Sequence, residues 1–323
     1  MTFLEPFKNF EFLERNDMKQ FIIIIFLLWV YVLTVMSQEN SDSAGLNALS
    51  PDALQAVTAL FKYDRSIPLD ARILERYETK TYVHEKIVFT GVRGDRVPGY
   101  LAIPKTGSTP HPIVCLFHVS AGSKASWWDD MSFERGLSVT DTLLELGIAV
   151  LALDAQYHGE RSINNDFLPI QQMYFDEKWV CRYRDGIIQT VGDYLRAVDY
   201  LGGRGEIDVQ RIGVLGHSMG GVMAVLFSTL EKRVKALVAS VAAYSDPWLF
   251  PLTPFNLANG IQAPTLLLAG RTDIIISIDA TQKLFSLLKT EVKEMELYES
   301  GHRLPRENIN RSVAWLNEYM KKK

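Results

Sequence analysis

The sequence predicts an α/β fold in which a mostly parallel central sheet carries helices on both faces and an antiparallel N-terminal hairpin at one edge. Short apolar runs rich in β-branched residues alternate with helix-like stretches along most of the chain. Runs that stay apolar without alternating are typical of strands buried on both faces, as strands are in a parallel sheet. The runs cover residues 112–117, 148–153, 211–215, 234–241, 264–268 and 294–298, and the helical stretches include 185–201, 279–288 and 306–320.

The composition excludes several other classes of protein. The chain has 323 residues, of which 47% are hydrophobic and 22% are charged, and its formal net charge is −4. This much apolar content argues against intrinsic disorder, and a net negative chain lacks the basic surface that binds nucleic-acid phosphates. The 2 cysteines are too few for a disulfide framework or a cysteine-rich zinc site. We therefore expect a globular protein without a nucleic-acid partner.

The first 37 residues differ from the rest of the chain. Residues 21–36 (FIIIIFLLWVYVLTVM) are uncharged and apolar. They are short for a membrane span, which needs about 20 residues, and close to the apolar core of a signal peptide. Residues 1–17 lack the basic start of a signal peptide, whereas a chain that begins at Met18 (MKQ) has one. We predict translation from Met18, cleavage after Ser37, and export to the periplasm or the medium. An uncleaved membrane anchor over 21–36 is the alternative.

Residues 38–78 are predicted to form a polar linker and a helical lead-in. Ser50 precedes Pro51, and a serine N-cap before a proline at the first helical position is a common start of a helix. This segment leads into the main domain.

The main domain is expected over residues 79–323. Residues 79–90 and 96–103 are β-rich and flank a short turn with glycines, which predicts the hairpin at the edge of the sheet. Two stretches without clear periodicity, 158–182 and 247–261, are rich in aromatic residues together with polar residues or proline. We predict that both are lid-like insertions near the carboxyl edge of the sheet.

Residues 216–220 (GHSMG) match the pattern G-x-S-x-G. A strand-like run (IGVL) precedes the match and a helix-compatible run (VMAVLFSTL) follows it, which is the context that gives the pattern meaning. The turn between them is so tight that the neighbours of the serine must be small. Such a turn lifts the Ser218 hydroxyl above the sheet and places it near a helix N-terminus, where N–H groups favour a developing negative charge. Ser218 is the predicted nucleophile.

A serine nucleophile needs a histidine base, and the base needs a carboxylate that orients it. On a strand-turn-helix architecture these residues follow in the chain order serine, acid, histidine. His302 is the only histidine after Ser218 and follows the last strand-like run. Asp273 ends the run before it and is the predicted acid, with Asp246 as the alternative. Among the other histidines, His158 is predicted to fix a loop.

Several longer segments match one known group of proteins. They are VRGDRVPGYLAIPK, an Asp-x-x-x-His-Gly-Glu loop, GEIDVQRIGVLGHSMGG, APTLLLAGRTD and ESGH. Over about residues 86–317 the chain resembles the α/β-hydrolase superfamily, and within it the branch of dienelactone hydrolases, acetyl xylan esterases and prolyl-oligopeptidase-like enzymes. The resemblance implies the α/β-hydrolase fold and a triad of Ser218, Asp273 and His302. It also implies that the backbone N–H of Met219 is one oxyanion donor.

One departure from the family concerns the second oxyanion donor. After its third strand the family usually has His-Gly and then the donor residue, whereas this chain has His118-Val119-Ser120. Glycine tolerates a positive φ at little cost and β-branched valine does not. Either Val119 has an ordinary conformation and the loop is shifted, or Val119 is strained. In both cases the departure from His-Gly weakens the assignment of Ser120 as the second donor.

The expected activity is hydrolysis of small-molecule carboxylic esters through an acyl-enzyme, without a metal or organic cofactor. A serine peptidase acting on short peptides, an acyltransferase on the same triad, and a non-catalytic binding protein on a hydrolase scaffold are the alternatives. Contact with a membrane is expected only through an uncleaved N-terminal segment. An aromatic-lined pocket is suggested by Trp127, Trp128, Tyr174, Trp179, Trp248 and Phe250.

Overall fold

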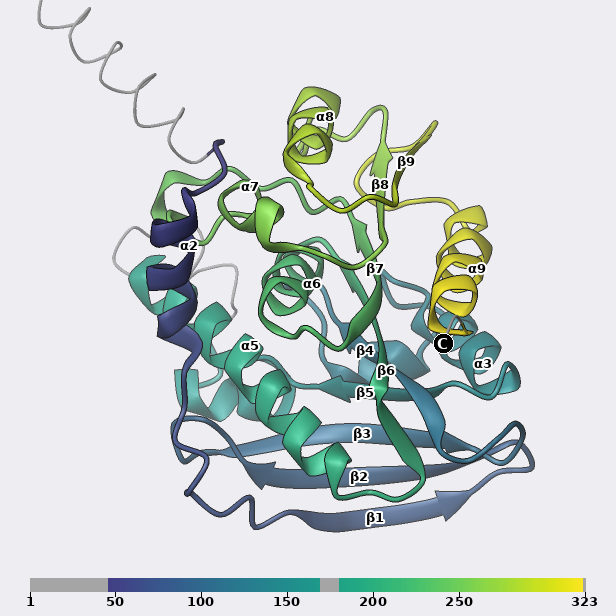
Figure 1. Ribbon diagram of the computed structural model, residues 1–323. Coiled ribbons are helices and arrows are strands. Elements are labelled where there is room, and N and C mark those ends of the chain that lie inside the picture. Colours follow the sequence, from purple (N-terminus) through teal and green to yellow (C-terminus); the bar gives the residue numbers. More distant parts are fainter. Residues whose placement is uncertain (1–45, 169–179, 322–323) are drawn as a thin grey trace, which may run out of the picture. The chain divides into compact units, whose positions relative to one another are not determined.

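A nine-stranded sheet forms the centre of the structure, a computed structural model that describes residues 46–168 and 180–321 (Figure 1). The strands lie in the order β1-β2-β3-β5-β4-β6-β7-β8-β9. The neighbours from β5 to β9 in this order are parallel, whereas β1, β2, β3 and β5 are joined by antiparallel pairs. The strands are β1 (Arg72–Glu78), β2 (Tyr82–Thr90), β3 (Arg96–Pro104), β4 (His111–Phe117), β5 (Ala149–Leu153), β6 (Ile207–His217), β7 (Val234–Ser240), β8 (Thr265–Gly270) and β9 (Lys293–Tyr298).

The predicted mostly parallel sheet with an antiparallel N-terminal part is confirmed. The apolar runs of the sequence became β4 to β9, and β2 and β3 form the expected hairpin. All residues of β5 and β8 are buried, in agreement with the near-continuous apolar character of those runs.

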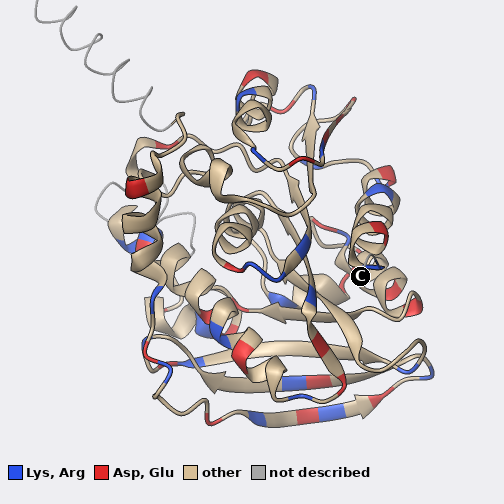
Figure 2. Cartoon of the chain, in the orientation of Figure 1, with Lys and Arg blue, Asp and Glu red and all other residues tan. Residues whose placement is uncertain are grey.

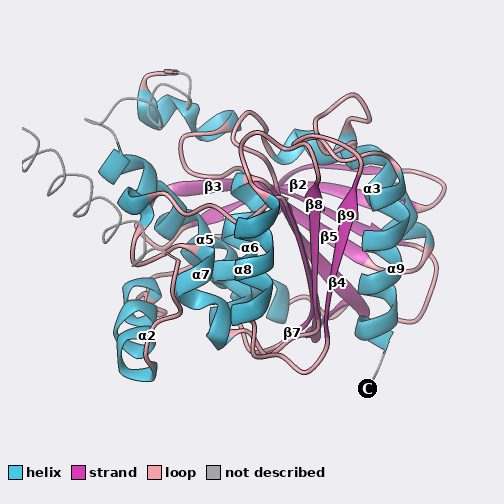
Figure 3. Cartoon of the chain, turned by 90° about the horizontal axis from the view of Figure 1, so that it is seen from above, coloured by secondary structure: helices cyan, strands magenta, loops and turns pink. Residues whose placement is uncertain are grey.

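Helices cover both faces of the sheet, as predicted. Figure 3 shows α3 and α9 on one face and α5, α6 and α8 on the other. The helices are α2 (Pro51–Thr58), α3 (Gly136–Glu145), α5 (Val180–Gly202), α6 (Met219–Leu230), α7 (Pro254–Leu257), α8 (Ile278–Leu287) and α9 (Glu307–Lys321). Short 3₁₀ segments are η1 (Ala59–Phe61), η2 (Lys124–Trp128), η3 (Gly159–Asn165), η4 (Pro247–Leu249) and η5 (Ala258–Gly260).

The prediction of a linker and helical lead-in over 38–78 is wrong for β1, which pairs with β2 and extends the sheet beyond the hairpin. Every residue of β1 is exposed, so the strand has no buried face to produce an alternation of apolar and polar residues. Charges of both signs follow one another along β1 and β2 (Figure 2). Cross-strand ion pairs join Arg76 to Glu85 at 3.9 Å and Glu75 to Lys86 at 3.6 Å.

The predicted start of α2 is present. The Ser50 Oγ accepts a hydrogen bond of 3.3 Å from the N–H of Ala53, and Pro51 occupies the first turn. Just before the helix, the Asn256 side chain donates a hydrogen bond of 2.7 Å to the carbonyl of Asn47. The lead-in is thus attached to the segment that contains α7.

Several predictions fall outside the described residues. The signal peptide or anchor over 1–37 is one of them, and residues 169–179 of the insertion predicted over 158–182 are another. The insertion predicted over 247–261 is described and contains η4, α7 and η5. Within 46–168 and 180–321, no helix combines the length and the apolar character that a membrane span requires.

Candidate active site

The turn between β6 and α6 holds Ser218 in a strained conformation. β6 ends at His217 and α6 begins at Met219, so Ser218 alone makes the turn, with φ 58° and ψ −122°. Residues other than glycine rarely adopt such angles, and they persist where the surroundings enforce them. A Cβ on Gly216 would lie 2.1 Å from the carbonyl oxygen of Gly220, and one on Gly220 would lie 2.0 Å from a backbone oxygen of β4. The glycines of the motif are therefore sterically required.

The structure brings Ser218, His302 and Asp273 into one hydrogen-bonded chain. The His302 Nε2 lies 2.9 Å from the Ser218 Oγ, and the His302 Nδ1 lies 2.8 Å from the Asp273 Oδ2. The other oxygen of Asp273 accepts hydrogen bonds from the N–H groups of Ile275 at 2.8 Å and Ile276 at 3.1 Å. The Asp273 side chain is completely buried, whereas the ring of His302 is 15% exposed. The carboxylate is thereby fixed from both sides.

The hydrogen-bond chain also sets the positions of its protons. An ionised carboxylate only accepts hydrogen bonds, so the Nδ1 of His302 carries the proton that points at Asp273. In the neutral ring the Nε2 of His302 is then free to accept the proton of the Ser218 hydroxyl. This is the arrangement that a general base for a serine nucleophile needs.

Sequence reasoning missed the contribution of His217, the residue before Ser218. The His217 Nε2 lies 3.2 Å from the carbonyl oxygen of His302, and the ring of Phe133 packs against both histidine rings. Burial, together with repulsion from His302, lowers the pKa of His217 to about 3. His217 is therefore neutral at physiological pH and donates this hydrogen bond, which holds the backbone of the loop that carries His302.

Sequence reasoning also missed Tyr244, which lies in the loop after β7. Its Oη is 3.0 Å from the Ser218 Oγ and 3.5 Å from the His302 Nε2. No motif marks this residue, because its position depends on the path of the loop and not on a pattern in the sequence.

A cavity of about 490 Å³ opens over Ser218. It lies within the size range of small-molecule sites, and its wall is mostly apolar. Asp246, the alternative acid of the sequence analysis, belongs to this wall, whereas Asp273 is the residue bonded to His302. The principal apolar and aromatic side chains of the wall are Phe133, Tyr183, Ile187, Tyr244, Trp248 and Leu249.

Among the described residues that were predicted to line the pocket, only Trp248 belongs to the cavity wall. Trp127 is fully buried in the core, Trp128 packs against the core, and Phe250 is 41% exposed outside the wall. Composition identifies aromatic residues near the insertions but not the direction in which each side chain points. The two remaining candidates, Tyr174 and Trp179, lie outside the described residues.

The loop after β4 resolves the question raised by Val119. The φ of Val119 is not positive, so the first alternative, an ordinary conformation, is the one observed. Its N–H donates a hydrogen bond of 2.8 Å to the Glu134 Oε1, and its carbonyl accepts hydrogen bonds from the His118 Nδ1 and the Gly122 N–H. Ser120 follows in the chain and lies on the cavity wall with Ser218.

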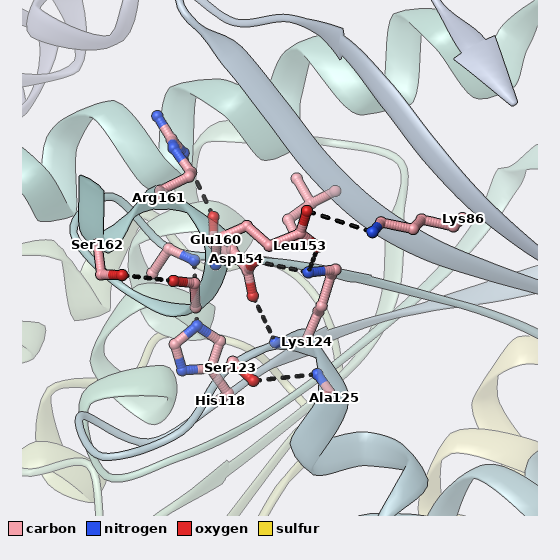
Figure 4. Close-up of polar contacts among 12 residues, drawn as sticks. Lys86, His118, Ser123, Lys124, Ala125, Leu153, Asp154, Glu160, Arg161 and Ser162 are labelled. Carbon is pink, nitrogen blue, oxygen red and sulfur yellow. Dashed lines mark hydrogen bonds and ion pairs between the residues drawn. The ribbon is translucent and has the colours of Figure 1, made fainter. Parts of the chain in front are cut away.

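A buried ion pair joins the loop after β4 to the loop after β5 (Figure 4). The Lys124 Nζ lies 2.7 Å from the Asp154 Oδ2 and 2.6 Å from the Glu160 Oε1, and both Lys124 and Asp154 are buried. Asp154 also accepts hydrogen bonds of 2.9 Å from the N–H groups of Lys124 and Glu160. Burial favours the neutral amine, but attraction and hydrogen bonds to Asp154 and Glu160 outweigh it and raise the pKa of Lys124.

Replacing Lys124 with methionine is expected to lower the free energy of unfolding by about 3–5 kcal/mol, because Asp154 is left as an unpaired buried carboxylate. Denaturant unfolding measures the loss. Lys86→Met is the control, since Lys86 contacts Glu160 at 3.3 Å from a more exposed position. The free energy of unfolding of Lys86→Met is expected to fall by no more than about 1 kcal/mol. Equal losses of unfolding free energy in the two variants would contradict the expectation that the buried ion pair of Lys124 matters more than the exposed one of Lys86.

His158 fixes a loop, as predicted. Its Nδ1 lies 2.9 Å from the carbonyl oxygen of Gln156, and its N–H donates to the carbonyl of Ala155 at 3.0 Å. Burial and then repulsion from His118 lower the pKa of His158 to about 3. The buried ring is therefore neutral over most of the acidic range.

The neutral state of His158 predicts a dependence of stability on pH. Between pH 6.5 and about 3 the unfolded chain binds a proton at His158 that the folded chain does not bind. This histidine therefore lowers the free energy of unfolding by about 1.4 kcal/mol for each pH unit of acidification in that window. His158→Asn should remove that part of the slope. Parallel curves of unfolding free energy against pH for the two proteins would refute the expectation.

Comparisons with known proteins show similarity to hydrolases. The family model described as "Dienelactone hydrolase family" matches residues 97–303. A putative hydrolase, YtaP, from Bacillus subtilis is 27% identical over 175 residues, which cover 53% of this chain and 56% of the relative. Bis(hydroxyethyl) terephthalate hydrolase from Streptomyces coelicolor is 34% identical over 143 residues, 39% of this chain and 41% of the relative. The chain thus spans about half the length of these curated relatives.

The fold is also similar to that of a solved structure. Acetyl xylan esterase 1 from Thermoanaerobacterium superposes with a TM-score of 0.62 over 84% of this chain and 95% of that one, at 19% identity. The superposition supports the α/β-hydrolase fold. The resemblance stated from the sequence motifs is confirmed by the family match, which covers well over half of the chain. This chain belongs to the dienelactone hydrolase family.

Proposed function

We propose that this protein is a serine esterase that hydrolyses carboxylic esters of small molecules through an acyl-enzyme. The observation that carries the proposal is the chain of hydrogen bonds from Asp273 through His302 to Ser218 at the cavity. Membership of the dienelactone hydrolase family supports the same reaction class.

Acylation begins when Ser218 attacks the carbonyl carbon of the ester. His302 takes the serine proton on Nε2 as the Oγ–carbon bond forms, and Asp273 holds the ring in the required tautomer. The ester bond to the alcohol then breaks, and His302 gives its proton to the departing oxygen. In the second half, His302 removes a proton from water, which attacks the acyl-enzyme and releases the acid.

The negative charge on the carbonyl oxygen needs hydrogen-bond donors. We assign this role to the N–H groups of Met219, at the start of α6, and of Ser120 on the cavity wall. The φ of Val119 is not positive, so the departure from His-Gly does not strain the loop at this residue. A non-catalytic binding protein on the same scaffold is the alternative, and labelling of Ser218 by a fluorophosphonate probe distinguishes it from an esterase. Each oxyanion donor is worth about 10²–10³ in turnover in comparable enzymes.

Because the wall of the cavity is mostly apolar, we expect the acyl or alcohol group of the substrate ester to be uncharged. One relative is named for an aromatic diester and one structural neighbour for acetylated xylan, so both chemistries belong among the candidates. The test uses purified protein with p-nitrophenyl esters of increasing acyl length, acetylated sugars and short acyl peptides. Faster hydrolysis of esters than of peptides is expected. A preference for peptides, or product formation only with an alcohol acceptor, would replace the proposal by a peptidase or an acyltransferase.

The location of the protein is a separate proposal. The apolar segment 21–36 preceded by Met18 supports export with cleavage after Ser37, and an anchor over the same segment is the alternative. N-terminal sequencing of protein recovered from the periplasm or the medium tests both. An N-terminus at residue 38 supports cleavage, whereas one at residue 1 or 18 contradicts it.

A further inference from the structure

Tyr244 is a polar group at the reacting atoms that the proposed acyl transfer does not yet use. Its Oη lies 3.0 Å from the Ser218 Oγ and 3.5 Å from the His302 Nε2, and its ring is part of the cavity wall. The Tyr244 hydroxyl therefore lies next to the Ser218 Oγ and the His302 Nε2, the two atoms between which the serine proton is transferred.

The backbone that carries Tyr244 is strained and tightly packed. Val241, directly after β7, is fully buried and has φ 45°, which β-branched residues rarely adopt. Its N–H donates to the carbonyl of Leu268 at 2.7 Å, and the N–H of Tyr244 donates to the carbonyl of Ala242 at 2.8 Å. A Cβ on Gly221 of α6 would lie 2.7 Å from the Cβ of Ala242, so helix and loop are in close contact. The fold enforces this path, which brings Tyr244 to Ser218.

The direction of the hydrogen bond follows from the rest of the site. The Ser218 hydroxyl gives its proton toward His302, so the Ser218 Oγ accepts the O–H of Tyr244. Burial raises the pKa of Tyr244. The phenol therefore keeps its proton at neutral pH and acts as a donor.

We propose that Tyr244 is a further catalytic residue, which donates a hydrogen bond to the leaving-group oxygen during acylation. This inference rests on the proposed serine esterase function. The departing oxygen is attached to the carbon that Ser218 has attacked, and it must come within reach of the His302 Nε2 to receive a proton. In the structure the Tyr244 hydroxyl lies within 3.5 Å of the Ser218 Oγ and the His302 Nε2. A leaving oxygen that reaches the His302 Nε2 therefore comes within reach of the Tyr244 hydroxyl, which donates a hydrogen bond to it.

The balance of the step is simple. The carbon–oxygen bond to the alcohol breaks and its electron pair stays on the leaving oxygen. The proton on His302 transfers to that oxygen, the carbonyl reforms, and Tyr244 keeps its own proton throughout. In deacylation Tyr244 donates in the same way to the oxygen of the attacking water, whose proton goes to His302.

This role makes the benefit of Tyr244 depend on the leaving group. An alkoxide is strongly basic and gains much from a donor, whereas p-nitrophenolate carries its charge on a delocalised ring and gains little. Hydrogen bonds to charged groups correspond to about tenfold to a hundredfold in rate. Tyr244→Phe should therefore lower kcat/KM by that factor for ethyl acetate, and by less than about threefold for p-nitrophenyl acetate.

The experiment compares kcat/KM for both esters in the wild-type protein, in Tyr244→Phe and in Tyr77→Phe. Tyr77 lies on the exposed edge strand β1, far from β6 in the sheet order, so its loss should leave both rates unchanged. An equal loss on both esters in Tyr244→Phe would assign the tyrosine a structural role. A gain on either ester would mean that it only blocks the site, and unchanged rates would mean that it does nothing. Each of these three results overturns the proposal.

Two further measurements separate this proposal from the one on which it rests. Fluorophosphonate labelling of Ser218 in Tyr244→Phe, together with an unchanged circular dichroism spectrum, verifies that the variant is folded and has an intact nucleophile. If the wild-type protein neither reacts with the probe nor hydrolyses any ester, the esterase proposal fails and not only the role of Tyr244. Should Tyr244→Phe fail to fold, Tyr244→Leu is the second variant, with the same selective loss expected on ethyl acetate.

Discussion

Replacing Ser218 with alanine is expected to abolish ester turnover, with kcat lower by on the order of 10⁴-fold or more. The Ser218 Oγ is the proposed nucleophilic atom. Its removal also leaves the His302 Nε2 without the hydroxyl group that it is to deprotonate. Alanine adopts the same backbone conformation at no greater cost, so the turn between β6 and α6 should persist. Turnover of p-nitrophenyl acetate and labelling by a fluorophosphonate probe measure the loss.

The matched control is Ser228→Ala. Ser228 lies on the same helix α6 and is also buried, but its hydroxyl has no hydrogen-bond partner among the described residues. This variant should keep its activity and its probe labelling, and both variants should melt close to the wild-type temperature. Labelling that persists in Ser218→Ala would refute Ser218 as the nucleophile.

Replacing Asp273 with asparagine is expected to lower kcat by about 10⁴-fold. An amide that keeps its oxygen toward the N–H groups of Ile275 and Ile276 turns its NH₂ group toward the Nδ1 of His302. The ring then places its proton on Nε2 in order to accept at Nδ1, and it can no longer take the proton of Ser218. The loop should stay folded, because the amide oxygen replaces the carboxylate oxygen that these N–H groups contact.

Asp246→Asn distinguishes the two acids that the sequence left open. Asp246 lies on the cavity wall, so its replacement can alter the binding of substrate but does not affect the hydrogen bond to His302. We expect a change of less than about tenfold, chiefly in KM. The reverse order, with Asp246→Asn the more damaging of the two, would transfer the role of the acid to Asp246.

The sequence was most informative where geometry depends on a local pattern. The glycines around Ser218 report a turn so tight that a Cβ at Gly216 or Gly220 would overlap backbone atoms. The chain order of Ser218, Asp273 and His302 follows from parallel strands that end at one edge of the sheet. The strands β4 to β9 were recognisable because burial on both faces leaves continuous apolar runs.

The features that the sequence did not reveal depend on contacts between distant segments. The edge strand β1 is held by backbone pairing and surface charges, so it has no apolar signature. The bond between Val119 and Glu134 needs the path of the loop after β4, and the pair of Lys124 and Asp154 joins residues 30 positions apart. The position of Tyr244 follows from a backbone conformation at Val241 that valine rarely adopts, which no residue preference would predict.

The strained residues after β6 and β7 have a consequence for how the protein can evolve. Ser218 and Val241 follow neighbouring parallel strands, and both have a φ that favours glycine. A change to glycine at Val241 would relieve strain, but it would also free the segment that presents Tyr244 to the nucleophile. Selection for thermal robustness and selection for turnover therefore act in opposite directions at this position. Stabilising changes that spare activity should accumulate instead far from this edge of the sheet, for example on the exposed strand β1.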